Sequence, residues 1–427
     1  MIKKITVSIC LLFSLAIFAQ EGTSSPYSFY GIGDIKFKGS VENRSMGSIS
    51  VLPDSIHINI QNPAFLADLK LTGLALGVTY ANTKSKTETQ EAKARRTSLD
   101  YLAVGIPVGK LGIGFGLIPY SSVGYKIGKT ITTTNTNNET ISNFTKRSGI
   151  GGVNKVFLGF GYRITNKINI GADVQYNFGT IETSDLQYQT DLQYGTRENN
   201  ASELRGVNFD LGISYQTKVN TKYSFFSSLS YTPEAELTLG NSRNIEIVQL
   251  LSSSAVSVIE RENIPVADTK INLPAKFSFG SGFGEVKKWL VGGEITFLNN
   301  SAMSNRFNDI NNSRFENAVR YSLGGFFIPN YNSYSNYYKR IVYRGGLRYE
   351  NTGLVIQNPG YPEKSITDFA ANIGLGMPLI GTFTNINIGL EIGKRGTKYA
   401  NLVEENYINI SVGLSLSEKW FVKRKFD

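Results

Sequence analysis

The sequence predicts an all-β fold, a 14-stranded antiparallel transmembrane β-barrel with an N-terminal segment that plugs its lumen. Three observations predict it: an export signal, a long series of segments with alternating apolar and polar residues, and connections that alternate between short and long. Charged residues make up only 18% of the 427 residues and aromatic residues reach 12%. Beyond residue 19 no run approaches the roughly 18 apolar residues of a spanning helix, which excludes a helical membrane protein.

The first 19 residues are typical of a secretory signal peptide. Two lysines precede an apolar run from Ile5 to Phe18, and Ala19 is the small residue before the expected cleavage point. Cleavage removes Cys10, the only Cys, so we expect an exported chain without disulfides.

Residues 20–70 are turn-rich and are expected to form the plug. Asn62 is a good N-cap and Pro63 suits the first helical position, so the sequence from Pro63 through Ala64 to residue 68 predicts a short helix. The segment is too apolar to remain an exposed tail. Fourteen strands enclose more space than their own side chains fill, so the lumen is its expected place.

Residues 71–418 are expected to form the barrel. In TNINIGLEIG (384–393), for example, every second residue is Ile or Leu, which gives a strand one apolar face. The predicted strands are 71–81, 98–108, 110–121, 153–164, 166–178, 206–217, 222–236, 274–285, 287–298, 317–329, 339–351, 367–378, 383–394 and 405–418. The predicted long loops are about 82–97, 122–152, 179–205, 237–273, 299–316, 352–366 and 395–404. Alternation alone also fits a soluble β-sandwich, but the signal peptide and the loop asymmetry favour a barrel.

An N-terminal plug that ends in Asn62-Pro63-Ala64 and is followed by fourteen strands resembles the FadL-type outer-membrane transporters of long-chain fatty acids and other hydrophobic compounds. SPYSFYGIGD (25–34) and SEKWFVKRKFD (417–427) are similar to exported β-barrel proteins of Bacteroidota. The resemblance implies uptake of hydrophobic small molecules, which leave sideways through a gap beside a kinked third strand. Pro119 lies in the third predicted strand, where it either breaks the pairing or ends the strand at the outer rim.

Charged residues at positions expected to face the lumen give a second interpretation. They are Asp173, Asp210, Glu294, Arg320, Arg344, Arg348 and Glu391. Such charges must be paired or hydrated, so they predict a network that clamps the plug. A polar lumen of this kind also fits a non-transporting accessory subunit of a larger outer-membrane complex, for secretion or barrel assembly. The plug, the Asn62-Pro63-Ala64 motif and Pro119 together favour transport, and the accessory subunit is the alternative.

The sequence does not predict an enzyme, a metal site or a cofactor. His57 is the only His and lies in the plug without a nucleophile motif. The alternating glycines at 112–116 are explained by a strand, because no helix follows them.

The expected location is the outer membrane, with both termini in the periplasm. The basic residues of the first long loop would face lipopolysaccharide phosphates: Lys84, Lys86, Lys93, Arg95 and Arg96. Other possible partners are outer-membrane lipid, a hydrophobic ligand, and other outer-membrane or periplasmic proteins, contacted through loops, the outer wall or the basic tail 419–427. Nucleic acid is not expected as a partner.

Overall fold

The structure is a computed structural model that describes residues 22–134, 140–251, 256–306, 312–333, 335–379 and 382–419. The expected signal peptide (1–19) and all of the basic tail except Lys419 lie outside these residues.

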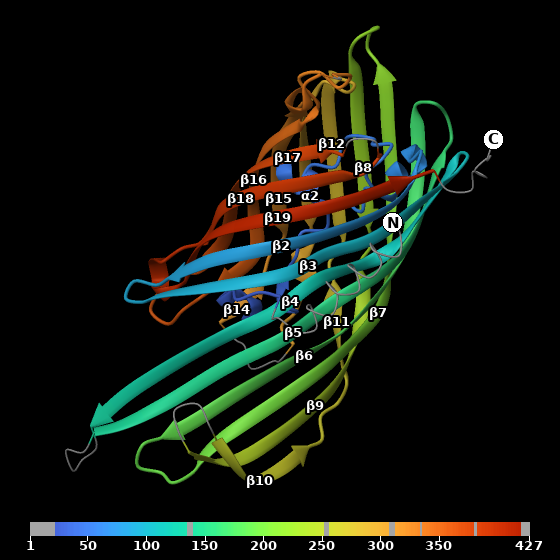
Figure 1. The fold of residues 1–427 in the computed structure, drawn as a ribbon. Coiled ribbons are helices and arrows are strands. Elements are labelled where there is room, and N and C mark those ends of the chain that lie inside the picture. The colour runs from blue at the N-terminus through green and yellow to red at the C-terminus, as the bar shows by residue number, and fades with distance from the viewer. Residues whose placement is uncertain are drawn as a thin grey trace.

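Within the described residues, 19 strand segments form one closed sheet (Figure 1). The strands are β1 (Asp34–Ile35), β2 (Thr72–Lys86), β3 (Glu91–Val108), β4 (Leu111–Thr134), β5 (Thr140–Arg163), β6 (Ile168–Gln189), β7 (Gly195–Lys218), β8 (Ser224–Thr232), β9 (Ala235–Leu250), β10 (Val256–Ile264), β11 (Thr269–Leu273), β12 (Lys276–Glu285), β13 (Trp289–Leu298), β14 (Ser313–Phe315), β15 (Ala318–Phe327), β16 (Val342–Ile356), β17 (Lys364–Pro378), β18 (Asn385–Gly396) and β19 (Glu404–Glu418). The short helices are η1 (Pro26–Phe29), α2 (Val41–Ser45), η2 (Pro63–Asp68), η3 (Asn300–Ala302), η4 (Tyr337–Arg340) and η5 (Tyr399–Asn401).

These segments occupy fourteen barrel positions. β8 and β9 follow one another along β7, β10, β11 and β12 follow one another along β9 and β8, and β14 and β15 lie end to end along β16. The barrel closes where β19 pairs with β2, from Glu404 opposite Lys86 to Glu418 opposite Thr72. The predicted fold class, a 14-stranded antiparallel barrel, is therefore confirmed.

The predicted long loops are wrong in one respect, because much of their length is strand. β4 and β5 have 24 residues each, whereas about 9–11 residues cross a bilayer. Figure 1 shows this hairpin and the neighbouring β6–β7 and β9–β10 hairpins extending far from the barrel body. The predicted strands end where the apolar alternation of the sequence ends. Outside a membrane, however, a ladder of backbone hydrogen bonds continues without an apolar face, and the Thr-rich stretch 130–134 suits it.

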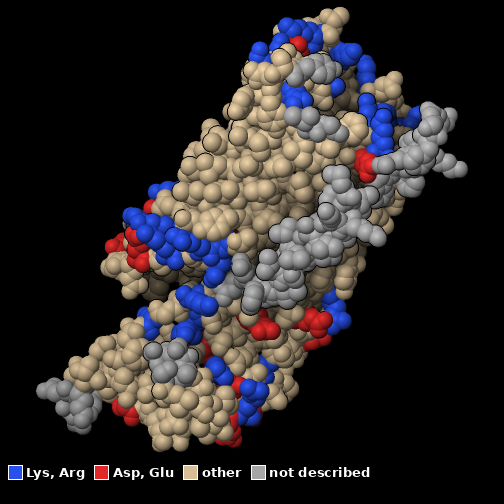
Figure 2. Space-filling model, viewed as in Figure 1, with Lys and Arg blue, Asp and Glu red and all other residues tan. Residues whose placement is uncertain are grey.

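The outer wall is apolar. Leu158, Phe160 and Tyr162 of β5, for example, are each 43–46% exposed on its outer face. Figure 2 shows a broad wall free of blue and red between charged ends. Within the described residues, the helices are all too short to cross a membrane.

Residues 22–71, which we call the plug, contact the inner face of the barrel wall through two short helices. η2 packs on β4, β5, β6 and β7, and α2 packs on β16, β17, β18 and β19. Glycines on the inner wall permit this approach: a Cβ on Gly112 would lie 1.8 Å from the Leu66 carbonyl oxygen, and one on Gly346 would lie 2.2 Å from the Gly47 nitrogen. Of the alternating glycines at 112–116, Gly112 and Gly114 thus make room for Leu66 of η2.

Candidate functional site

Asn62, Pro63 and Ala64 fix the plug to the wall at the start of η2. The Asn62 side chain accepts a hydrogen bond from the Ala64 amide at 3.0 Å, as expected of an N-cap, and Pro63 is the first helical residue. The same side chain donates to the carbonyl oxygens of Ile213 at 3.3 Å and Leu229 at 3.0 Å. Asn62 is 2% exposed and Ala64 is fully buried, so this motif joins the plug to β7 and β8.

Asp173 and Asp210 form the first electrostatic clamp on the plug. They lie directly opposite each other on β6 and β7, and Gln175 donates to both at 2.7 Å. Lys38 of the plug binds Asp210 and lies 3.8 Å from Asp173. Burial lowers the pKa of Lys38, but the two carboxylates raise it by more, so the ammonium stays charged.

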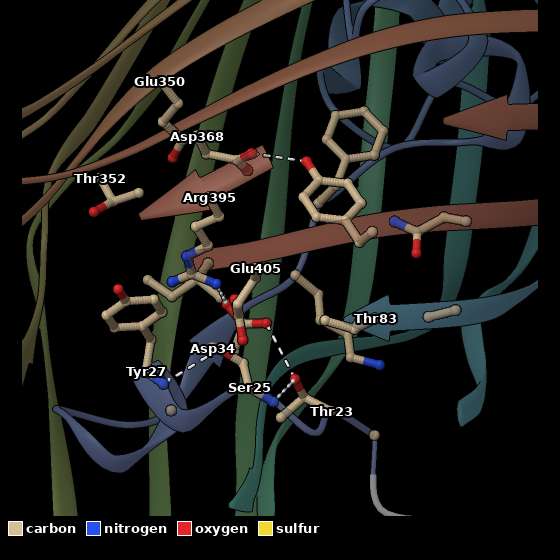
Figure 3. Close-up of a pocket in the computed structure, with 18 of the residues that line it drawn as sticks. Thr23, Ser25, Tyr27, Asp34, Thr83, Glu350, Thr352, Asp368, Arg395 and Glu405 are labelled. Atoms are coloured by element: carbon tan, nitrogen blue, oxygen red, sulfur yellow. Dashed lines mark hydrogen bonds and ion pairs between the residues drawn. The ribbon is translucent and has the colours of Figure 1, made fainter. Parts of the chain in front are cut away.

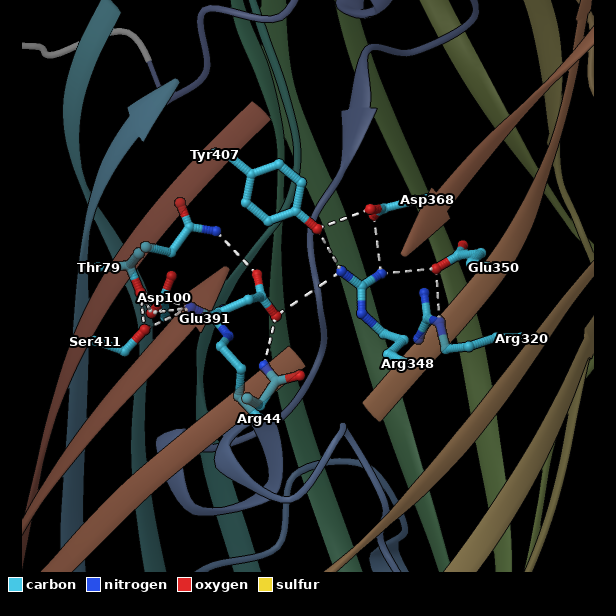
Figure 4. Close-up of polar contacts among 12 residues, drawn as sticks. Arg44, Thr79, Asp100, Arg320, Arg348, Glu350, Asp368, Glu391, Tyr407 and Ser411 are labelled. Carbon is cyan, nitrogen blue, oxygen red and sulfur yellow. Dashed lines mark hydrogen bonds and ion pairs between the residues drawn. The ribbon is translucent and has the colours of Figure 1, made fainter. Parts of the chain in front are cut away.

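Arg44 of α2 forms the second clamp. Its Nη1 atom donates to Thr79 at 2.5 Å, to Ser411 at 2.9 Å and to Asp100 at 3.2 Å (Figure 4). These partners come from β2, β3 and β19, so one plug cation spans the line where the barrel closes.

His57 belongs to a third cluster at the plug surface. Its Nδ1 atom lies 2.7 Å from Asp54 and its Nε2 atom 3.6 Å from Glu42. Burial lowers the pKa of His57, but Asp54 and Glu42 raise it by more, so its net pKa lies above the ordinary value, although Arg344 opposes this. Asn387 of β18 donates to Glu42 at 2.6 Å and accepts from Arg344 at 2.8 Å, which ties the cluster to the wall.

Arg320 and Arg348, which were expected to hold the plug, form ion pairs with residues of the wall. Arg320 pairs with Glu350 at 2.8 Å, and Arg348 lies 3.1 Å from both Glu350 and Asp368 (Figure 4). All of these residues belong to β15, β16 and β17, so their charges are satisfied within the wall. Side chains on neighbouring strands are close enough to form ion pairs with each other, so these wall residues neutralise one another without a plug residue.

The two predicted carboxylates Glu294 and Glu391 have different roles. Glu294 of β13 accepts a hydrogen bond from the Ser50 amide of the plug at 2.7 Å. Glu391 of β18 stays within the wall, where Asn372 and Asn409 donate to it at 2.8 and 2.9 Å and Arg348 lies 3.8 Å away. The predicted network is therefore several separate groups.

A polar cavity of about 260 Å³ lies between the plug and these wall charges. Figure 3 shows Arg395 of β18 and Asp34 of the plug facing each other there, with 2.5 Å between charged atoms. Charged residues from both sides line the cavity: Asp34, Lys36, Arg44, Arg96, Asp100, Arg320, Arg348, Glu350, Asp368, Glu391, Arg395 and Glu405. Such a lining suits water and ions. An apolar molecule in this cavity would displace water from charged groups without replacing the lost hydrogen bonds, which is unfavourable.

Pro119 lies where β4 changes its neighbours. β4 continues to Thr134, so Pro119 does not end the strand. Its pairing with β5 shifts register between Pro119 and Ser121, and its pairing with β3 covers only Leu111–Leu117. Beyond that point the plug segment β1 pairs with β4, with Asp34 opposite Ser122. We call the stretch where β3 and β4 are unpaired, residues 91–101 and 118–134, the seam.

Sequence reasoning missed Lys38, Arg44 and Asp100 as plug-holding residues. One feature of the sequence could have indicated the first of these contacts. The plug carries cations, and the predicted inward carboxylates Asp173 and Asp210 lie on consecutive strands, where they could bind such a cation together. The described residues contain no cluster of His, Cys, Asp and Glu that could hold a metal ion.

Comparison with solved structures shows the fold. The Pseudomonas putida toluene transporter TodX is similar with a TM-score of 0.56 at 16% identity, covering 91% of this chain and 100% of that one. The Ralstonia pickettii toluene transporter TbuX gives a TM-score of 0.56 at 14% identity, covering 90% and 99%. A FadL homologue of Pseudomonas aeruginosa gives 0.55 at 12%, covering 90% and 98%.

No curated protein matches the chain. A family model described as BamG matches residues 1–427, and the chain therefore belongs to the BamG family.

Proposed function

We propose that this protein is a non-transporting accessory barrel of a larger outer-membrane complex, for secretion or barrel assembly. The observation that carries the proposal is the polar, ion-paired interior: its 260 Å³ cavity is lined by charged groups from plug and wall. The family name BamG points in the same direction.

The plug is costly to move. An apolar ligand that passed through the lumen would have to separate Lys38 from Asp210 and Arg44 from Asp100, since these pairs join plug to wall. Separating a buried pair leaves uncompensated charges and costs about 3–5 kcal/mol. The apolar residues of the interior support the same conclusion, because Phe226 and Leu290 already pack against the plug residues Ile49 and Val51.

In this proposal the barrel spans the outer membrane with both termini in the periplasm. Its partners contact the outer wall, the long hairpins and the basic tail 419–427, which carries Lys419, Lys423, Arg424 and Lys425. Lipopolysaccharide phosphates contact the β2–β3 hairpin, where Lys84 and Lys93 lie opposite each other and Glu91, which pairs with Lys84 and Lys86, neutralises only part of the positive charge.

Uptake of hydrophobic small molecules is the second candidate function. The seam beyond Pro119 favours it, because missing pairing between β3 and β4 is a possible lateral exit. The shared fold with toluene transporters supports it as well.

One experiment separates the two functions. The tagged chain is expressed from its own locus, purified from native membranes and compared with a deletion strain in uptake assays of labelled toluene and oleate. If the role is accessory, membrane proteins should co-purify with the chain in stoichiometric amounts. The deletion strain should then take up toluene and oleate as fast as the wild type, after correction for any difference in general envelope permeability. Loss of uptake in the deletion strain, with no protein partner on the purified chain, would establish transport instead.

A further inference from the structure

The seam leaves strand edges without a neighbour. β3 begins at Glu91, but it pairs with β4 only from Leu102 to Val108. β4 runs on to Thr134 beside β5. Figure 1 shows the β2–β3 and β4–β5 hairpins diverging from this point. Among the described residues, the β3 edge at 91–101 has β2 on one side and no strand on the other.

Such an edge is an acceptor for another strand. Its backbone N–H and C=O groups form a regular row, and in or near a bilayer they are costly to leave unpaired. The chain itself shows that the seam accepts a strand: β1 pairs with β4 at Ser121 and Ser122, and the Lys36 amide donates to the Tyr120 carbonyl oxygen at 2.9 Å. This added strand has only two residues and leaves the β3 edge open.

The β3 edge is also basic on its outer face. Asp100, Ser98 and Arg96 line the inner cavity, so alternation along β3 places Arg95 and Lys93 outward. The hairpin end has two carboxylates, Glu88 in the turn and Glu91 at the start of β3. Glu91 lies 2.5 Å from Lys84 of β2 and so is already paired. Figure 2 shows a blue cluster at the end of this hairpin. An incoming strand would therefore be favoured by acidic residues at its outward positions.

We propose that the seam accepts an acidic β-strand of a partner protein, which adds to β3 along residues 91–101. The inference rests on the proposed accessory role and names one contact through which that role is exercised. A lipid phosphate could meet Lys93 and Arg95, but it cannot satisfy a row of alternating donors and acceptors. The backbone pattern therefore favours a polypeptide over lipopolysaccharide.

The test uses the purified full chain in lipid nanodiscs and a fluorescent ten-residue peptide of alternating Glu and Val. Hydrogen exchange is followed at amides of 91–101, and affinity by fluorescence anisotropy. We expect peptide binding with protection of this stretch. N-methylation of the peptide on its pairing edge should weaken binding more than tenfold, since it removes several backbone hydrogen bonds at once. The variant Lys93→Glu with Arg95→Glu should weaken it by a similar factor.

The matched control is Arg205→Glu on β7, an exposed residue on a strand paired on both sides, which should leave binding unchanged. Three results would overturn the inference: amides of 91–101 that exchange slowly in the chain alone, protection by lipopolysaccharide but not by peptide, or binding insensitive to N-methylation. Absence of co-purifying proteins would refute the accessory role separately, because the peptide assay needs no native partner.

Discussion

Replacing Lys38 with Met should release the plug from β6 and β7. The substitution keeps the length of the side chain and removes the charge that lies between Asp173 and Asp210. These two carboxylates are directly opposite each other, so without Lys38 they become a buried like-charge pair that only the more distant wall cations Lys155 and Lys276 still oppose.

The magnitude follows from the geometry. At the 3.8 Å that separates Lys38 from Asp173, two unit charges attract by about 4 kcal/mol at an effective dielectric constant of about 20. Desolvation of the ammonium offsets part of this gain, while the closer contact with Asp210 adds to it. The expected loss in the free energy of unfolding is about 3–5 kcal/mol, as for other buried pairs that lose one partner.

The assay is urea unfolding of the purified barrel in detergent, followed by tryptophan fluorescence, with conductance in planar bilayers as a second readout. Lys38→Met should lower the free energy of unfolding and raise the conductance. Adding Asp210→Asn to the same chain should recover part of the loss, because it removes the uncompensated charge.

The matched control is Lys270→Met. Lys270 forms a 2.7 Å pair with Glu236, but both side chains are more than half exposed, so the expected cost is below about 1 kcal/mol. If Lys38→Met costs no more than Lys270→Met and leaves the barrel closed, the clamp does not hold the plug.

Further predictions concern the plug cap, the buried histidine and the topology. Asn62→Ala should cost about 2–4 kcal/mol in urea unfolding, because it removes a cap and two further hydrogen bonds from plug to wall carbonyl groups, whereas the exposed cap substitution Asn336→Ala should cost about 1 kcal/mol or less. Because the pKa of His57 is raised in the folded state, its stabilising effect is complete below about pH 6.5 and is lost as pH rises through the folded-state pKa. His57→Gln should therefore reduce the change in the free energy of unfolding between pH 6 and 9. An unchanged pH dependence would contradict this. Single cysteines at Thr134 and Lys167 should be labelled by an impermeant reagent on intact cells and not labelled, respectively, and the reverse pattern would refute periplasmic termini.

The sequence by itself determined the barrel and the start of η2. Alternation is a local property with a period of two residues, so segments such as 384–393 identify themselves as strands without knowledge of their neighbours. The N-cap at Asn62 was equally local, since cap and capped amide are two residues apart. Strand ends were less predictable, because outside the membrane the ladder needs no apolar signal.

The tertiary structure decided which charges meet and where the wall opens. Lys38 and Asp210 are 172 residues apart, and Arg44 and Ser411 are 367 apart, so their pairing depends on how the closed barrel wraps around the plug. Arg348 looked equally suited to hold the plug, but it pairs with Glu350, two residues along the same strand, and with Asp368 on the neighbouring strand β17. Pro119 correctly indicated where the pairing of β4 changes. The seam itself depends on the tertiary structure, because β3 and β4 diverge beyond Leu117 and a strand edge is open only where no neighbouring strand lies beside it.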